Sequence, residues 1–195
     1  MAELQTAISF LQQKSKHELL HDQTSEILNL LGGYSKTLSL LEQYDTGTVA
    51  KIKGAKASYI FEYGETIKII KELRSELAEK GEAGDLFGSK RDSAFEGIIR
   101  GLYQSFGGKE AYPTIEEKAA HLLYFIIKDH PFSDGNKRIG SFLFVYYLDR
   151  NNYLYRETGE KKINDNALVA LALLVAVSNP KDKDVMIKII INLVK

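Results

Sequence analysis

Residues 130–138 read HPFSDGNKR and hold the chain's densest set of side chains suited to chemistry. A histidine titrates near neutral pH, which suits His130 to the work of a general base. The carboxylate of Asp134 offers the hard oxygen ligands that magnesium prefers. Two adjacent cations, Lys137 and Arg138, follow within the same nine residues. A base, a carboxylate and two cations so close together predict a site for the phosphates of a nucleotide.

The second half of this run is expected to open a helix. Gly135 lets the backbone approach a ligand closely. Asn136, Lys137 and Arg138 then fall on the first turn, where free N–H groups and the helix dipole attract anions. Phe132 is expected to anchor the run in the core. A polar loop between two helices would explain any one of these residues, but not their convergence within nine positions.

Two predicted helices hold this run in place. Before it, apolar residues spaced as one face of a helix are Ile115, Ala119, Leu122, Leu123, Ile126 and Ile127. Thr114 is the expected N-cap, and Glu116 and Glu117 suit the positive end of the helix dipole. After the run, residues 137–150 are apolar or aromatic on almost every side, which indicates a helix buried in a bundle.

Helical spacing dominates the rest of the chain as well. Further helices are predicted over 4–11, 19–31, 38–41, 66–80, 164–178 and from Asn179-Pro180 onward. Residues 46–58 are small, polar and basic, which is typical of a linker or an exposed loop, and residues 81–94 are polar and contain glycine, which is typical of a loop. Short hairpins are expected within residues 95–103 and 153–163.

The composition excludes several classes of function. The 195-residue chain has no cysteine, which excludes a disulfide scaffold, a cysteine-ligated metal and a thiol nucleophile. Lys and Arg number 26 and balance 26 Asp and Glu, so a broad basic surface for nucleic acid is not expected. The longest apolar run, residues 167–177, is too short for a membrane helix, and the N-terminus lacks the pattern of a signal peptide. We expect a cytoplasmic protein without membrane contacts.

The run HPFSDGNKR resembles the signature of the Fic/Doc family, which is His-x-Phe-x-(Asp/Glu)-(Gly/Ala)-Asn-(Gly/Lys)-Arg. The resemblance extends over about residues 85–178 and implies an all-α fold, a Fic-type helical bundle with a short β-hairpin flap. It places a Fic-like domain in residues 61–195 and leaves residues 1–60 as a helical N-terminal extension. Typical members transfer AMP from ATP to a hydroxyl of a target protein, and the Doc branch transfers the terminal phosphate.

The resemblance implies a role for each matching position. His130 resembles the base that deprotonates a Ser, Thr or Tyr hydroxyl of the target, Phe132 the buried anchor and Asp134 the Mg²⁺ ligand. The residues expected to bind ATP through its phosphates are Gly135, Asn136, Lys137 and Arg138. The flap that would hold a target segment as an added strand is expected at Phe95, Glu96, Gly97, Ile98, Ile99 and Arg100.

The motif is mixed between the two branches. Lys137 stands where AMP-transferring members commonly have Gly, and Ser141 stands where they often have a second Arg. Lys is the Doc-branch residue, but Gly135 replaces the Ala common there. AMP transfer is our first hypothesis, Doc-like protein phosphotransfer the second, and a non-catalytic nucleotide- or partner-binding module the third. Beyond the target protein, an antitoxin-like inhibitor and a second copy of the chain are candidate partners.

A second motif that could do chemistry lies near the N-terminus. His17, Glu18 and His21 match the zinc-hydrolase pattern His-Glu-x-x-His. No third ligand follows at the expected spacing, and Ser15 with Glu18 also fits a capping box. We therefore favour a structural interpretation, with a zinc hydrolase as the alternative. His121, nine residues before His130, is interpreted as a packed or surface helix residue and not as a ligand.

Overall fold

The computed structural model describes residues 39, 41–43, 45–48 and 54–195. The chain divides into two compact units, Met1–Ala50 and Lys51–Lys195. In the first unit, residues 41–43 are helical, which agrees with the predicted helical N-terminal section. The predicted helices at 4–11 and 19–31, and with them the His17/His21 motif, lie outside the described residues.

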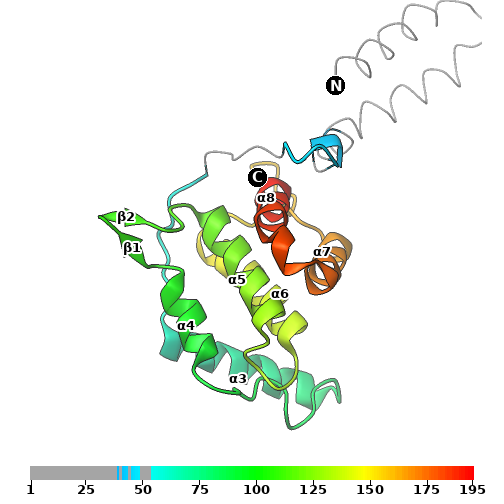
Figure 1. The fold of residues 1–195 in the computed structure, drawn as a ribbon. Helices are drawn as coiled ribbons and strands as arrows, with labels where there is room; N and C mark the ends of the chain where they lie inside the picture. Colours follow the sequence, from blue (N-terminus) through cyan, green and yellow to red (C-terminus); the bar gives the residue numbers. More distant parts are fainter. Residues whose placement is uncertain (1–38, 40, 44, 49–53) are drawn as a thin grey trace, which may run out of the picture. The chain divides into compact units, whose positions relative to one another are not determined.

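The second unit is helical apart from one small antiparallel hairpin, as the all-α prediction required (Figure 1). Its elements in chain order are α3 (Tyr63–Glu79), α4 (Ala94–Gly101), β1 (Ser105–Phe106), β2 (Lys109–Glu110), α5 (Ile115–Asp129), α6 (Asn136–Arg150), α7 (Asp165–Val177), the 3₁₀ turn η1 (Pro180–Asp182) and α8 (Lys183–Leu193). Among the described residues, no helix is both long and apolar enough to cross a membrane.

Helix α5 is the centre of the bundle and contacts α4, α6, α7 and α8 (Figure 1). Its start is fixed by the predicted cap: the Thr114 hydroxyl accepts from the Glu117 N–H at 3.2 Å, and the Glu117 carboxylate accepts from the Thr114 N–H at 3.2 Å. All six apolar positions predicted for its inner face are buried. Because this buried helix ends at Asp129, its packing fixes the position of the next residue, His130.

Residues 54–61 form a strap of chain laid across the bundle. Backbone N–H groups of the strap donate hydrogen bonds of 2.7–3.0 Å to three side chains, those of Glu116, Asn151 and Tyr103. Phe61 is buried and stacks on Tyr146 of α6 with ring centroids 6.0 Å apart. The sequence predicts a linker or exposed loop through residue 58, but the strap from residue 54 packs on the bundle as part of the second unit. Its small polar residues pack through their backbone, which the side-chain pattern does not reveal.

The predicted hairpin within residues 95–103 is wrong. Residues 94–101 form α4, and the hairpin follows it at Ser105–Glu110. Phe95, Ile98, Ile99 and Leu102 repeat at helical spacing and are all buried, which favours a helix over alternating strands. The tight turn instead lies at Gly107 and Gly108, whose φ values of 56° and 77° suit glycine. The second predicted hairpin is present in reduced form, as a Tyr155–Lys161 bridge.

Helices α6 and α7 differ in how much of their apolar surface is buried. In α6, Phe142, Val145 and Tyr146 are only half-buried, so this helix is less enclosed than its sequence predicts. In α7, which Asn164 caps as expected, one face is exposed through its large apolar side chains, Val169, Leu173, Leu174 and Val177. Exposed apolar faces of this kind are uncommon on monomers.

Candidate active site

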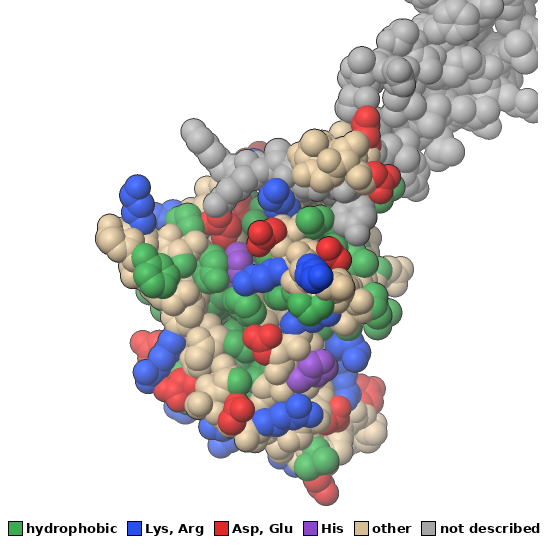
Figure 2. Space-filling model, viewed as in Figure 1, with side chains coloured by type: hydrophobic (Ala, Val, Ile, Leu, Met, Phe, Trp, Pro, Cys, Tyr) green, Lys and Arg blue, Asp and Glu red, His purple; other side chains and the backbone are tan. Residues whose placement is uncertain are grey.

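The loop between α5 and α6 lines a cavity of about 330 Å³. Its lining residues are Arg91, His130, Ser133, Asp134, Gly135, Asn136, Lys137 and Arg138. The structure thus brings together the base, carboxylate and cations that the sequence singled out. Figure 2 shows basic side chains in blue, acidic side chains in red and histidines in purple interspersed over the described face of the molecule.

Two left-handed residues shape the loop. His130 ends α5 with φ 48° and ψ 56°, a conformation that histidine tolerates better than most side chains. Gly135 precedes α6 with φ 83°. A Cβ at Gly135 would lie 2.4 Å from the ring of Phe87, so glycine is required here both for its conformation and for its size.

Phe132 and Asn136 anchor the loop from inside. Phe132 is fully buried and packs on Phe95 of α4, with ring centroids 4.8 Å apart. The side-chain amide of Asn136 accepts from the Phe132 N–H at 3.0 Å and donates to the Phe132 carbonyl at 2.8 Å. The side-chain amide of Asn136 therefore holds the loop closed. Only the backbone N–H of Asn136 is left to bind an anion.

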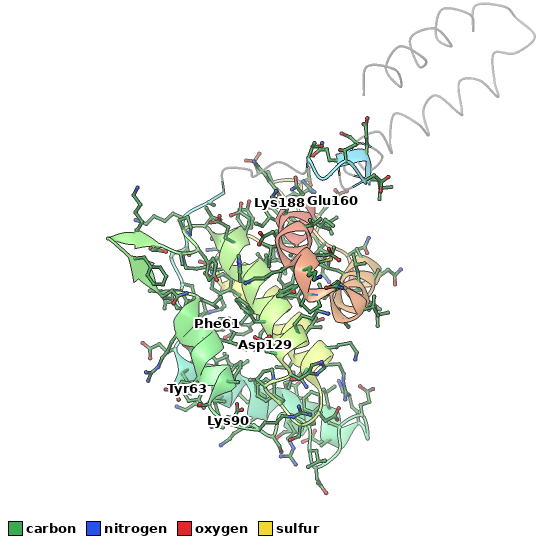
Figure 3. All side chains as sticks on the ribbon, viewed as in Figure 1. Phe61, Tyr63, Lys90, Asp129, Glu160 and Lys188 are labelled. Atoms are coloured by element: carbon green, nitrogen blue, oxygen red, sulfur yellow. The ribbon has the colours of Figure 1, made fainter. Side chains whose placement is uncertain are left out.

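A neighbouring segment, residues 86–91, clamps the loop from outside. Gly88 N–H donates to the Asp134 carbonyl at 3.1 Å, and Arg91 N–H donates to the Pro131 carbonyl at 3.0 Å. In return, Ser133 N–H donates to the Ser89 carbonyl at 2.8 Å. Lys90 in the same segment donates to the Tyr63 hydroxyl on α3 at 2.7 Å, and Figure 3 labels both residues. We name residues 86–91 the clamp.

The sequence prediction treats the clamp as an undistinguished loop. Its signal is faint: an apolar pair, Leu86-Phe87, within a polar stretch, followed by the cations Lys90 and Arg91. Phe87 proves to be fully buried, and Arg91 lines the cavity. Arg91 is thus a site residue that the sequence analysis missed.

Arg138 is held against the clamp side of the loop. Its guanidinium lies 4.6 Å from the centroid of the Phe87 ring and donates to the Glu82 carbonyl at 2.6 Å. It also lies 3.7 Å from the Asp134 carboxylate, and about half of each of the two side chains is exposed. These contacts keep the positive charge at the cavity without removing it from solvent.

The cavity is suited to an anion. Three cations line it, Arg91, Lys137 and Arg138, against the single carboxylate of Asp134. Its floor is the start of α6, where no side chain caps the free N–H groups. A helix N-terminus with basic neighbours attracts phosphate through both charge and directed hydrogen bonds.

The residues of the cavity can supply magnesium with one carboxylate ligand, that of Asp134. No group of three or more His, Asp or Glu side chains is placed to hold a metal in the described parts of the chain. Asp134, with about half of its side chain exposed, could supply one carboxylate ligand. Magnesium commonly keeps several waters and binds through one or two carboxylates plus substrate phosphates, so Asp134 fits a metal that arrives with its nucleotide.

Two other predicted features stand apart from the cavity. Of the six residues expected to form a flap, Phe95 contacts the loop through Phe132, and none lies in a strand. His121 stacks on Tyr112 at 3.7 Å between ring centroids, and burial lowers its pKa to about 4. It is neutral at physiological pH and packed, as the sequence analysis proposed.

Comparison with known proteins gives one match. Residues 64–148 match the model of the Fic/DOC family, a range that contains α3 except its first residue, the clamp, α4, the hairpin, α5, the loop and most of α6. No curated protein and no solved structure matches the chain.

Proposed function

Residues 64–148 match the model of the Fic/DOC family, and from this match we propose that the chain is a Mg-ATP-dependent transferase that moves AMP to a hydroxyl side chain of a target protein. The observation that supports this best is the single cavity that holds an exposed histidine, a carboxylate and three cations at an uncapped helix start. The base, the carboxylate and two of the three cations come from residues 130–138, and the third cation, Arg91, comes from the clamp.

In the proposed reaction, His130 takes the proton from the acceptor hydroxyl. The acceptor oxygen forms a bond to the α-phosphorus of ATP, and the bond from that phosphorus to the bridging oxygen breaks, releasing pyrophosphate. Lys137, Arg138 and the N–H groups of the first turn of α6 hold the phosphates. Magnesium, bound through Asp134 and the phosphates, would neutralise part of the charge.

The test is incubation with cell lysate and ATP carrying its label either on the α- or on the γ-phosphate. Labelling of a protein from α-labelled ATP alone supports AMP transfer. Nucleotide binding with no labelled protein would identify a binding module instead of an enzyme.

Substituting Asp134 by Ala tests the metal ligand. We expect Mg²⁺-dependent ATP binding to weaken at least ~tenfold, because the carboxylate that holds the metal beside the phosphates is lost. The measurement is ATP affinity with Mg²⁺ and with a chelator, and the two values should converge in the variant. Asp165→Ala, which removes an exposed carboxylate from α7, is the matched control. Equal ATP affinity with and without Mg²⁺ in the unaltered chain would contradict the role.

Transfer of the terminal phosphate is a second candidate, and Lys137 favours it. This lysine lies on the first turn of α6 and lines the cavity, where its charge acts on the orientation of the triphosphate. If the γ-phosphorus faces the acceptor, the same proton transfer to His130 leads to a phosphorylated target and ADP.

Replacing Lys137 with Gly tests what sets this choice. We expect the ratio of AMP transfer to phosphate transfer to rise, because one cation that draws the outer phosphates toward the start of α6 is gone. Doubly labelled assays measure the ratio, and Lys137→Ala separates loss of charge from the added backbone freedom of glycine. An unchanged ratio in both variants would show that another group orients the triphosphate.

A further inference from the structure

A second cavity of about 330 Å³ is lined by residues that lie close in the chain to those of the candidate active site. It is a groove between α4 and α5, lined by Ala94, Gly97, Ile98, Gly101, Gln104, Tyr112, Phe125 and Asp129. The two linings share no described residue, but Asp129 of the groove directly precedes His130 of the active site, and Ala94 follows three residues after Arg91. Figure 3 labels Asp129, the last residue of α5.

The groove differs in chemistry from the phosphate cavity. Among the described residues, no Lys or Arg lines it, and Asp129 places a carboxylate at the end next to His130 in the chain. Its wall is apolar and aromatic through Ile98, Tyr112 and Phe125, and Lys183 lies over the Phe125 ring at 4.4 Å. This lining is poorer in cations than the phosphate cavity and suits uncharged side chains, with Gln104 at the other end able to bond a peptide group.

The groove exists because one face of α4 lacks bulk. Positions 94, 97, 98 and 101 share a face of this helix, and two of the four are glycines. A Cβ added at Gly97 or Gly101 would meet no atom within 4 Å, so the space beside both is open. From Ala94 to Gly101 the groove follows ~10 Å of helix, which matches about three residues of extended chain.

We propose that this groove binds the target protein's segment next to the acceptor hydroxyl, an inference that rests on the proposed transferase function. In phosphorus transfer the attacking oxygen and the leaving oxygen lie roughly in line, so the acceptor reaches His130 from the side away from the outer phosphates. Lys137 and Arg138, the residues proposed to bind phosphate, lie on the first turn of α6 after the loop, whereas the groove reaches Asp129 at the end of α5, before the loop. About three uncharged residues on one side of the hydroxyl then lie along α4, on a helix face rather than as a strand added to a sheet.

The test fills the groove and leaves the phosphate cavity alone. Gly97→Leu and Gly101→Leu each place a branched side chain in the open space, and leucine has a higher helix propensity than glycine, so α4 is retained. Gly64→Leu is the matched control, because Gly64 lies in α3, is exposed and has the same open surroundings. Protein labelling from ATP in lysate and affinity for ATP are measured for all four chains.

We expect labelling to fall at least ~tenfold in both groove variants and to stay at the original level in Gly64→Leu, with ATP affinity within ~twofold throughout, well under the ~1.4 kcal/mol of a tenfold change. Unchanged labelling in the groove variants would overturn the proposal. A parallel loss of ATP affinity would also overturn it, by assigning the groove to the nucleoside. Absence of labelling by the unaltered chain would contradict the proposed function, and the groove proposal with it.

Discussion

Replacement of His130 is expected to reduce transfer by ~10²–10⁴-fold, the usual cost of losing a general base. The affinity for ATP should change little, because the base acts on the acceptor hydroxyl, whereas phosphate binding is assigned to the other cavity residues, Lys137, Arg138 and the N–H groups of α6. The measurements are the rate of labelling and the ATP affinity of the same preparations.

The backbone at this position determines which variants are informative. His130 is left-handed at φ 48°, where alanine is strained by ~1–2 kcal/mol and asparagine is better tolerated. His130→Asn therefore removes the base while it keeps the loop, and His130→Ala tests the same loss with added strain. Equal loss of activity in both, with higher stability in the Asn variant, is the expected pattern. A fully active His130→Asn chain would rule out the mechanism.

Replacement of Asn136 by Ala is expected to destabilise the second unit by about 3 kcal/mol. The side-chain amide of Asn136 satisfies both the N–H and the carbonyl of Phe132, which is fully buried. Each buried backbone group left without a partner costs ~1–3 kcal/mol. Urea denaturation measures the change, and ATP affinity should fall as well because the start of α6 loses its fixed relation to the loop.

Two further variants sharpen this result. Asn136→Asp keeps an acceptor for the Phe132 N–H but lacks the donor for the Phe132 carbonyl, so an intermediate loss is expected. Asn166→Ala removes an exposed amide from α7 and should stay within ~0.5 kcal/mol. If Asn136→Ala were as stable as Asn166→Ala, the amide would not be what closes the loop.

The burial of Asn136 also changes how the motif is understood. From its residue type and its place at the start of α6, the sequence predicts that Asn136 binds an anion. In the structure its side-chain amide is bound to Phe132, while a cation that lies outside the motif, Arg91, also lines the cavity. The motif therefore divides its work between residues that face the ligand and residues that hold the loop.

The sequence by itself determined the helices that carry the site and the loop between them. Apolar spacing and the Thr114 cap located α5, the run from Gly135 located the start of α6, and the motif named most of the residues that line the cavity. These signals are local: a helix repeats every 3.6 residues and its caps lie within a few residues of its ends, so neighbouring letters contain the information.

Only the tertiary structure decided the clamp, the strap and the identity of α4. The clamp and the strap are held by backbone N–H and carbonyl groups, which every residue carries and which leave no mark on side-chain periodicity. Residues 94–102 mix glycine with apolar residues, a pattern that suits a hairpin or a helix, and burial of Phe95 against Phe132 selects the helix. The groove beside His130 exists because that selection turns Gly97 and Gly101 toward α5.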